Sequence, residues 1–406
     1  MRRLKILIVG SNSRPAAVSA KKIGHEVYAV DYWGDQDLRS TVDDVEAIKT
    51  YGLGEHPTES EAPLGMKLVE LAFKMAKKHK EVDYVLVSSG LDDYPDLWDS
   101  LGEIAPVLGN QPQVIRKVRD RIEFLERARK SGLAIPPTER VTNLEDAISV
   151  ASKFQYPVVL RPYATSGGFR LKLAKRDSEL RSAWEIISTH KGEPAYVQKY
   201  VEGKLDVSVS ILCDREKCVS VTANEQLIGL RGLGVTAPFS YCGNIVPLKD
   251  KEDVIESIIQ ASLKLGEDFK LAGSNGFDFI ISPEDTPIIM ECNPRFQGTL
   301  ECIEEVSGLN LVKEHIRACL GDLRATPILT KGCSVKLVLF ARQASIIPDL
   351  MKIRHIVDIP PPGAFVEKGE PICSVQLWDT TRESAISHAY EVAERVYSLL
   401  RSVKPE

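Results

Sequence analysis

Several features are missing from this 406-residue sequence, and each absence argues against a class of protein. No apolar run approaches the roughly 20 residues that a membrane-spanning helix needs, so we expect no membrane partner. The net charge is −5 with acids and bases interspersed, which gives no sequence-wide basic surface for nucleic acid. The eight cysteines are dispersed and never form CxxC, which argues against a zinc module or a disulfide framework. Reduced thiols in a cytoplasm are the simplest account, so we predict a cytoplasmic location.

The first part of the chain alternates apolar strands with helices. Strands are predicted over 4–10, 25–31 and 81–90, and helices over 14–24 and 63–79. This order predicts a Rossmann-like parallel αβ domain over 1–109, with a binding crevice at the carboxyl ends of its strands. The turn after the first strand, GSNSRP, lacks the glycines of GxGxxG, so nicotinamide binding is not expected.

Arg14 lies in one of these crevice loops. An arginine can bind a carboxylate through two N–H groups, so Arg14 is a candidate for holding an anionic substrate. The alternative is an arginine that lies on the surface or starts the following helix, and the sequence does not separate the two.

Two boundaries divide the rest of the chain. A charged amphipathic helix over 111–132 follows a change of character near Gly109, and the second boundary lies around 327–332. Between them we predict a strand, turn and strand over 196–213, a hairpin with a polar turn over 275–293 and a helical segment over 300–321. The fold class is therefore mixed α/β and α+β, with domains over 110–327 and 328–406, the last one small and β-rich.

The hairpin over 275–293 carries the strongest chemical signal. Asp278 lies on one strand, and Glu291 and Asn293 lie two residues apart on the next, so the latter two point to one face. Oxygen ligands without His or Cys suit Mg²⁺ or Mn²⁺. Arg295 follows at once and offers a planar fork for a phosphoryl group or a carboxylate. The alternative is a surface hairpin with solvated acids, which is weakened because Glu291 interrupts the buried-looking run PIIMEC.

Two weaker signals precede this hairpin. Arg161 ends a strand that leads into a small loop with Ser166, Gly167 and Gly168, whose backbone N–H groups could cradle phosphates. A glycine pair is equally typical of an ordinary turn. The segment 197–203 could hold an adenine edge, with an acid after it for a ribose, although a plain core strand explains it as well.

In their order, these segments resemble the ATP-grasp superfamily, especially its biotin-carboxylase-like and carboxylate–amine ligase branches. The resemblance covers about 110–325, and the series acid–x–Asn–Pro–Arg in ECNPRFQG is its most specific part. It implies an ATP-grasp fold with a lid subdomain at about 133–200, preceded by the αβ domain and followed by a small C-terminal domain. It also implies ATP and Mg²⁺ (or Mn²⁺) as cofactors.

The resemblance further implies roles for single residues. The implied metal ligands are Asp278, Glu291 and Asn293. The implied nucleotide-binding residues are Arg121, Arg161, Ser166, Gly167, Gly168, Gln198, Lys199, Val201, Asp206 and Gln226. Arg295 and Arg161 are the implied catalytic residues, and Gln297 joins Arg295 and Arg14 as a candidate on the substrate side.

Three positions depart from the family pattern. Arg121 and Arg161 stand where the family usually has lysines that touch ATP phosphates, and a guanidinium is bulkier and planar. Thr299 stands at or near the place of the acid that biotin carboxylases use on bicarbonate.

The function implied by the resemblance is that of an ATP-dependent ligase. It would activate a substrate carboxylate as an acyl phosphate for attack by an amine, with two small-molecule substrates and with a homodimer as one allowed assembly. Two alternatives stay open. One is carboxylation through carboxyphosphate, which the missing acid disfavours. The other is a nucleotide-binding protein that has lost catalysis, which Arg121 and Arg161 motivate and the intact metal set opposes.

Overall fold

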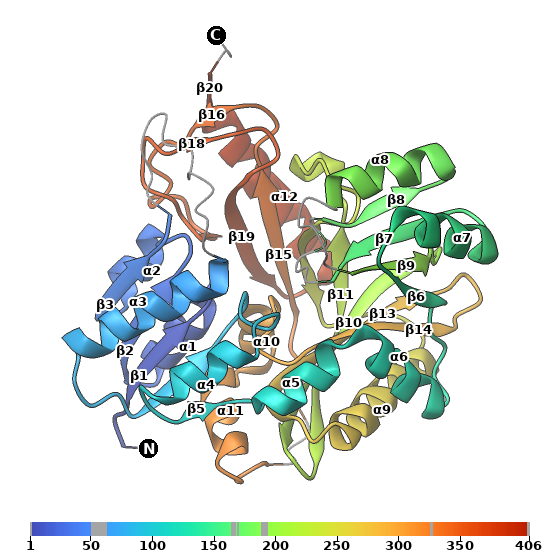
Figure 1. Cartoon of the computed structure of the whole chain (residues 1–406). Helices are drawn as coiled ribbons and strands as arrows, with labels where there is room; N and C mark the ends of the chain where they lie inside the picture. The colour runs from blue at the N-terminus through green and yellow to red at the C-terminus, as the bar shows by residue number, and fades with distance from the viewer. Residues whose placement is uncertain are drawn as a thin grey trace.

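A computed structural model describes residues 2–49, 63–163, 168, 170–187, 194–324 and 328–403 (Figure 1). Their strands form a five-stranded, an eight-stranded, a four-stranded and a three-stranded sheet. In Figure 1 the five-stranded sheet lies at the left in blue, the four-stranded sheet lies at the upper right in green, and the eight-stranded sheet runs between them. Within the described residues, no helix is long and apolar enough to cross a membrane.

The N-terminal sheet is parallel, as the sequence predicts. Its strand order is β3 (Asp44–Ala47), β2 (Glu26–Asp31), β1 (Lys5–Val9), β4 (Tyr84–Val87) and β5 (Val107–Leu108). Because side chains alternate along β1, Ile6 and Ile8 pack with α1 (Arg14–Lys22) on one face, while Leu7 and Val9 pack with α3 (Leu64–Lys78) on the other. The short helices α2 (Gln36–Thr41) and α4 (Asp96–Gly102) complete this layer.

The eight-stranded sheet is antiparallel and contains the predicted hairpin. Its order is β14-β13-β10-β11-β12-β15-β19-β17. The bounds are β10 (Leu205–Asp214), β11 (Cys218–Ile228), β12 (Tyr241–Val246), β13 (Ala272–Ile281), β14 (Pro287–Asn293), β15 (Cys333–Phe340), β17 (Ile356–Val357) and β19 (Pro371–Asp379). Helix α9 (Glu252–Asp268) packs on β10 and β11, and α12 (Arg382–Leu399) packs on β15 and β19. The sheet therefore continues across the predicted boundary near 327, and the division into domains stays a prediction.

The four-stranded sheet corresponds to the predicted lid region. Its order is β6 (Thr138–Val141), β9 (Ala195–Lys199), β7 (Val158–Pro162) and β8 (Lys172–Ala174), covered by α7 (Leu144–Phe154) and α8 (Asp177–Ile187). The two strands expected over 196–213 are present as β9 and β10. They belong to different sheets, because β9 pairs with β6 and β7 while β10 pairs with β11 and β13. The remaining short elements are η1 (Arg231–Leu233) and the three-stranded sheet of β16 (Ser345–Ile346), β18 (Phe365–Val366) and β20 (Arg401–Ser402).

Two predicted helical segments are each divided in two. The segment 111–132 forms α5 (Pro112–Arg119) and α6 (Arg121–Lys130), because Asp120 is extended and its carboxylate caps α6 by accepting the N–H of Glu123 at 2.9 Å. The segment 300–321 forms α10 (Leu300–Ser307) and α11 (Leu311–Cys319), separated at Gly308, whose φ is 70°.

The expectation that every cysteine is reduced is wrong for one pair. Cys213 and Cys218 form a disulfide across the turn between β10 and β11. The other cysteines, Cys242, Cys292, Cys302, Cys319, Cys333 and Cys373, are free and buried, as expected of small apolar side chains.

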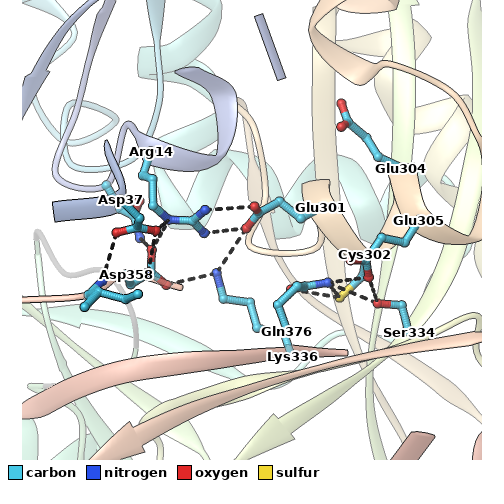
Figure 2. Close-up of polar contacts among 12 residues, drawn as sticks. Arg14, Asp37, Glu301, Cys302, Glu304, Glu305, Ser334, Lys336, Asp358 and Gln376 are labelled. Carbon is cyan, nitrogen blue, oxygen red and sulfur yellow. Dashed lines mark hydrogen bonds and ion pairs between the residues drawn. The ribbon is translucent and has the colours of Figure 1, made fainter. Parts of the chain in front are cut away.

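A buried ion-pair network joins three parts of the fold (Figure 2). Arg14, at the start of α1, is 2% exposed. Its Nε donates to Asp358 Oδ1 at 2.6 Å, and its Nη1 donates to Glu301 Oε1 at 2.9 Å. Lys336 Nζ on β15 lies 3.3 Å from Asp358 Oδ2, and Asp37 Oδ2 on α2 lies 3.4 Å from Arg14 Nε. The network therefore ties the N-terminal layer to α10 and to the C-terminal strands.

Helix α10 is also held from its other side. Gln376 on β19 donates from Nε2 to Glu305 Oε2 at 2.8 Å, beside Ser334 and Cys302 (Figure 2). Since α10 begins at Leu300, shortly after the Asn–Pro–Arg segment of 293–295, both sets of contacts help to position the end of β14 and its arginine.

We expect Arg14→Ala to lower the free energy of unfolding by about 3–5 kcal/mol, because Glu301 and Asp358 would stay buried with only Lys336 to compensate them. Urea denaturation measures the change. Arg116→Ala, at an exposed pair with Asp96, is the control and should cost less than about 1 kcal/mol. Equal losses in the two variants would contradict the structural role of Arg14.

Candidate functional site

A cavity of about 760 Å³ opens between the N-terminal layer, the four-stranded sheet and the eight-stranded sheet. One group of lining residues comes from β7, β9, β11, β13 and β14, and we call it the nucleotide side. A second group comes from the loops after β1, β2 and β4 and from the C-terminal strands and their loops, and we call it the crevice side.

The predicted metal ligands meet on the nucleotide side. Asp278 on β13 stands directly opposite Glu291 on β14, beside a register shift at Asp278/Phe279. Asn293 Nδ2 donates to Asp278 Oδ2 at 2.9 Å, and Gln226 Nε2 on β11 donates to Asp278 Oδ1 at 3.0 Å. The hairpin therefore brings two carboxylates and an amide together, with Gln226 beside them.

The two unusual arginines converge on Glu291. Arg161 Nη2 lies 2.9 Å and Arg121 Nη2 lies 3.1 Å from Glu291 Oε2. Burial opposes ionisation of Glu291, but the positive charges of Arg161, Arg121 and Arg119 outweigh it and hold its pKa well below the usual value. Burial and the negative charge of Glu291 raise the pKa of Asp278. Arg161 lines the cavity, whereas Arg121 lines a small neighbouring pocket with Glu291.

The donor set fits a hard divalent cation. In the part of the chain that the structure describes, no cluster of three or more His, Cys, Asp or Glu side chains could hold a metal by itself. Two carboxylates and one amide oxygen are oxygen donors, however, and Mg²⁺ normally completes such an incomplete set with phosphate oxygens and water. These residues would therefore hold Mg²⁺ together with a phosphate-bearing ligand.

Arg295 is fixed by a residue that the sequence reasoning missed. Its Nε donates to Asp92 Oδ2 at 2.7 Å, its Nη2 donates to Asn293 Oδ1 at 3.1 Å and its Nη1 donates to the Phe296 carbonyl at 2.9 Å. Asp92 follows the predicted strand over 81–90, at the carboxyl end where the sequence places the binding crevice, and this position was the sequence feature that could have identified it. Although Asp92 is buried, Arg295 and Arg119 lower its pKa.

The other predicted nucleotide-binding residues line the same cavity where they are described. They are Gly168, Gln198, Lys199, Val201, Asp206 and Gln226. Gln198 Nε2 donates to Thr138 Oγ1 at 3.0 Å, and Lys199 Nζ donates to the Gln155 carbonyl at 2.7 Å. A Cβ at Gly168 would lie 1.9 Å from the Phe239 carbonyl oxygen, so only glycine fits there. Ser166 and Gly167 lie outside the described residues.

The two substrate candidates differ in their placement. Gln297 lines the cavity close to Arg295. Arg14 does not line it, and its guanidinium is occupied by the carboxylates of Glu301, Asp358 and Asp37. This geometry contradicts the prediction that Arg14 holds an anionic substrate, because protein carboxylates already take its donors.

The crevice side is acidic. Asn12, Asp35, Lys336, Asp358 and Glu370 are among its lining residues. Burial, together with the negative charges of Asp358, Asp31 and Asp37, raises the pKa of Asp35 to about 8. Burial also raises the pKa of Asp37, although Arg14 opposes the shift. Acidic side chains therefore outnumber basic ones on this side of the cavity.

Comparison with known proteins places the chain in a family. Residues 118–299 match the sequence model of an ATP-grasp domain. An uncharacterised protein of Methanocaldococcus jannaschii is 30% identical over 392 residues, which cover 96% of this chain and 91% of the relative. The chain belongs to the ATP-grasp superfamily. ATP and Mg²⁺ are the cofactors of this superfamily, in agreement with the oxygen-donor set at Asp278, Glu291 and Asn293.

Other ATP-grasp proteins resemble the chain in part of their sequence or in fold. The carbamoyl phosphate synthase large chain of Methanothermobacter thermautotrophicus is 29% identical over 218 residues, which cover 53% of this chain and 20% of the relative. The biotin carboxylase domain of the Hydrogenobacter thermophilus 2-oxoglutarate carboxylase, a dimer in complex with MgADP, ADP and bicarbonate, has a TM-score of 0.74 at 16% identity. The match covers 98% of this chain and 90% of that chain, and it shows a shared fold.

We expect Asp35→Asn to stabilise this ATP-grasp protein more at pH 8 than at pH 5. The pKa of Asp35 is raised to about 8 in the folded protein, whereas an aspartate in the unfolded chain titrates near pH ~4. Between these values the folded state holds a proton that the unfolded state has released, so the free energy of unfolding falls as the pH rises from about 4 to about 8. Asparagine cannot ionise and removes this dependence.

Urea midpoints of Asp35→Asn and the unmodified protein at both pH values measure the difference. Asp99→Asn is a matched control at an exposed position on α4, and it should change stability little at either pH. A gain in Asp35→Asn that is equal at pH 5 and pH 8 would show that Asp35 titrates normally.

Proposed function

We propose that the protein is an ATP-dependent carboxylate–amine ligase. A carboxylate oxygen attacks the terminal phosphorus of ATP, ADP leaves and an acyl phosphate forms. An amine nitrogen then attacks the acyl carbon, phosphate leaves with the electron pair of the broken C–O bond, and the nitrogen loses a proton to give an amide. One observation carries the proposal: Asp278, Glu291 and Asn293 share a cavity with the fixed guanidinium of Arg295 and with Arg161.

The arginines have distinct parts in this reaction. Three N–H groups of Arg295 bind Asp92, Asn293 and Phe296, which holds the fork in place before a substrate arrives. A fixed cation beside the transferred phosphoryl group stabilises the charge that develops there without reorganisation. Arg161 lines the cavity beside Glu291, and in this proposal it binds the phosphates of ATP. A Mg²⁺ ion on the oxygen donors would neutralise negative charge on phosphate oxygens.

Carboxylation is the second candidate, because the biotin carboxylase domain of similar fold is described with bicarbonate. Two contacts in this chain favour the ligase instead. Glu301, the first acid after Arg295 in the sequence, binds Arg14 through both carboxylate oxygens and does not line the cavity. Asp92 binds Arg295 itself and does not line the cavity either. Neither acid is placed to act on bicarbonate.

Release of ADP from MgATP, assayed against pairs of carboxylates and amines, tests the proposal. The ligase requires ADP formation that depends on both substrates and yields an equal amount of amide by mass spectrometry. ADP formation that depends on bicarbonate, with labelled bicarbonate found in the product, would favour carboxylation. Absence of MgATP binding by calorimetry would contradict both functions.

We expect Asp278→Asn to reduce turnover by at least ~10²–10³, because it removes a charge that holds the metal. Stability should stay the same or rise slightly, since repulsion between Asp278 and Glu291 is relieved. ADP release and urea midpoints on one preparation measure both effects. Asp285→Asn is the control on the same hairpin, where Asp285 pairs with Lys204 and Lys251 away from the cavity, and it should keep its turnover. Normal turnover in Asp278→Asn would remove Asp278 from the metal site.

Assembly and location are proposals too. The biotin carboxylase domain of similar fold is a dimer, and we propose a homodimer for this chain, which light scattering on the purified protein tests. A cytoplasmic location stays a prediction from the sequence.

A further inference from the structure

Asp35 occupies an unusual position on the crevice side. It stands at the N-cap of α2, where an aspartate usually accepts a backbone N–H, yet its carboxylate does not cap the helix. It is 4% exposed and lines the cavity. Within the described ranges, no side chain or backbone group donates a hydrogen bond to this carboxylate. Because Asp35 lines the cavity, a donor on a ligand can reach its carboxylate.

The surroundings of Asp35 contain other acceptors. Asn12 Oδ1 is buried and has no hydrogen-bond partner, while Asn12 Nδ2 donates to Asp358 Oδ1 at 3.3 Å. Both Asn12 and Asp358 line the cavity. Asp358 is already held by Asn12, Arg14 and Lys336, so among these side chains the carboxylate of Asp35 is the acceptor that a ligand in the cavity can reach.

The charges around this space do not balance. Five carboxylates lie around two cations, Arg14 and Lys336. They are those of Asp31, Asp35, Asp37, Glu301 and Asp358. Glu370 and Lys49 lie nearby and add one charge of each sign. The raised pKa of Asp35 agrees with this excess of negative charge.

We propose that the crevice side binds a cationic nitrogen of the amine substrate, with the carboxylate of Asp35 as its acceptor. This deepens the proposed ligase function and rests on it. A protonated amine supplies N–H donors and one positive charge, which suits the carboxylate of Asp35 and the excess of acids around it. An anionic group would meet acceptors and negative charge instead.

Calorimetry on the full chain with Mg²⁺ and a nonhydrolysable ATP analogue at pH 8 tests this. The probes are 1,5-diaminopentane, which is dicationic, and 1,5-pentanediol, its uncharged counterpart of similar length. The diamine should bind and the diol should not. Asp35→Asn should weaken diamine binding by about tenfold or more, because a hydrogen bond to a charged group is lost. Asp99→Asn should leave the affinity unchanged.

Three results would overturn the proposal: no binding of the diamine, equal binding of the diol, or equal diamine affinity in Asp35→Asn and the unmodified protein. If Asp35→Asn failed to fold, Asp35→Ser would replace it, with the same loss expected because the carboxylate is removed. Calorimetry measures binding without turnover, so failure of the proposed cation site can be distinguished from failure of the proposed ligase reaction. If the diamine binds but no carboxylate–amine pair releases ADP, the ligase function is rejected. The site would then bind a cation that is not a substrate of this reaction.

Discussion

The buried guanidinium of Arg14 constrains the relative positions of the three parts of this molecule. Removing a guanidinium from water costs several kcal/mol unless carboxylates compensate it, and the compensating groups come from α2, α10 and the loop after β17. Each of these elements must stay in place for the charge to be satisfied. Because Asp358 also lines the cavity, the same constraint shapes the space in which the substrates would meet.

On the nucleotide side the arrangement is the reverse: a carboxylate is surrounded by arginines. Glu291 is a partly buried carboxylate that two arginines neutralise in the absence of any ligand. The two arginines at the usual lysine positions share the single carboxylate of Glu291, so positive charge is in excess there, and burial together with the charge of Arg161 lowers the pKa of Arg121. Glu291 therefore has two guanidinium partners. The phosphates of a nucleotide would compete with Glu291 for these arginines, and a metal ion would compete with the arginines for Glu291.

The sequence predicted the strands and the hairpin, because their alternating apolar and polar residues are visible over a few consecutive positions. The alternation in β13 and β14 set Asp278 opposite Glu291, and the apolar runs of β1, β2 and β4 set the parallel layer. Contacts between distant residues escaped prediction: Arg14 meets Glu301 and Asp358 at separations of 287 and 344 residues. Asp92 and Asp35 escaped for the same reason, because their importance depends on what another segment brings beside them. The disulfide of Cys213 and Cys218 needed the β10–β11 register, which composition does not reveal.

The division of strands between sheets has a mechanical consequence. In the described part of the chain, no hydrogen-bonded ladder joins the four-stranded sheet to the eight-stranded one. The two are connected by the chain over 131–137 and 200–204, by the isolated bridge of Ala134 with Ile288 and by the ion pair of Arg161 with Glu291, so a movement of the four-stranded sheet would leave every strand ladder intact. The C-terminal strands have no such freedom, because β15 pairs with β12 in the sheet that carries Asp278 and Glu291. Removal of the residues after 327 would leave β12 as an unprotected edge, open to pairing with other chains. The C-terminal strands are therefore a fixed part of the cavity wall, whereas the four-stranded sheet shares no strand pairing with the rest of that wall.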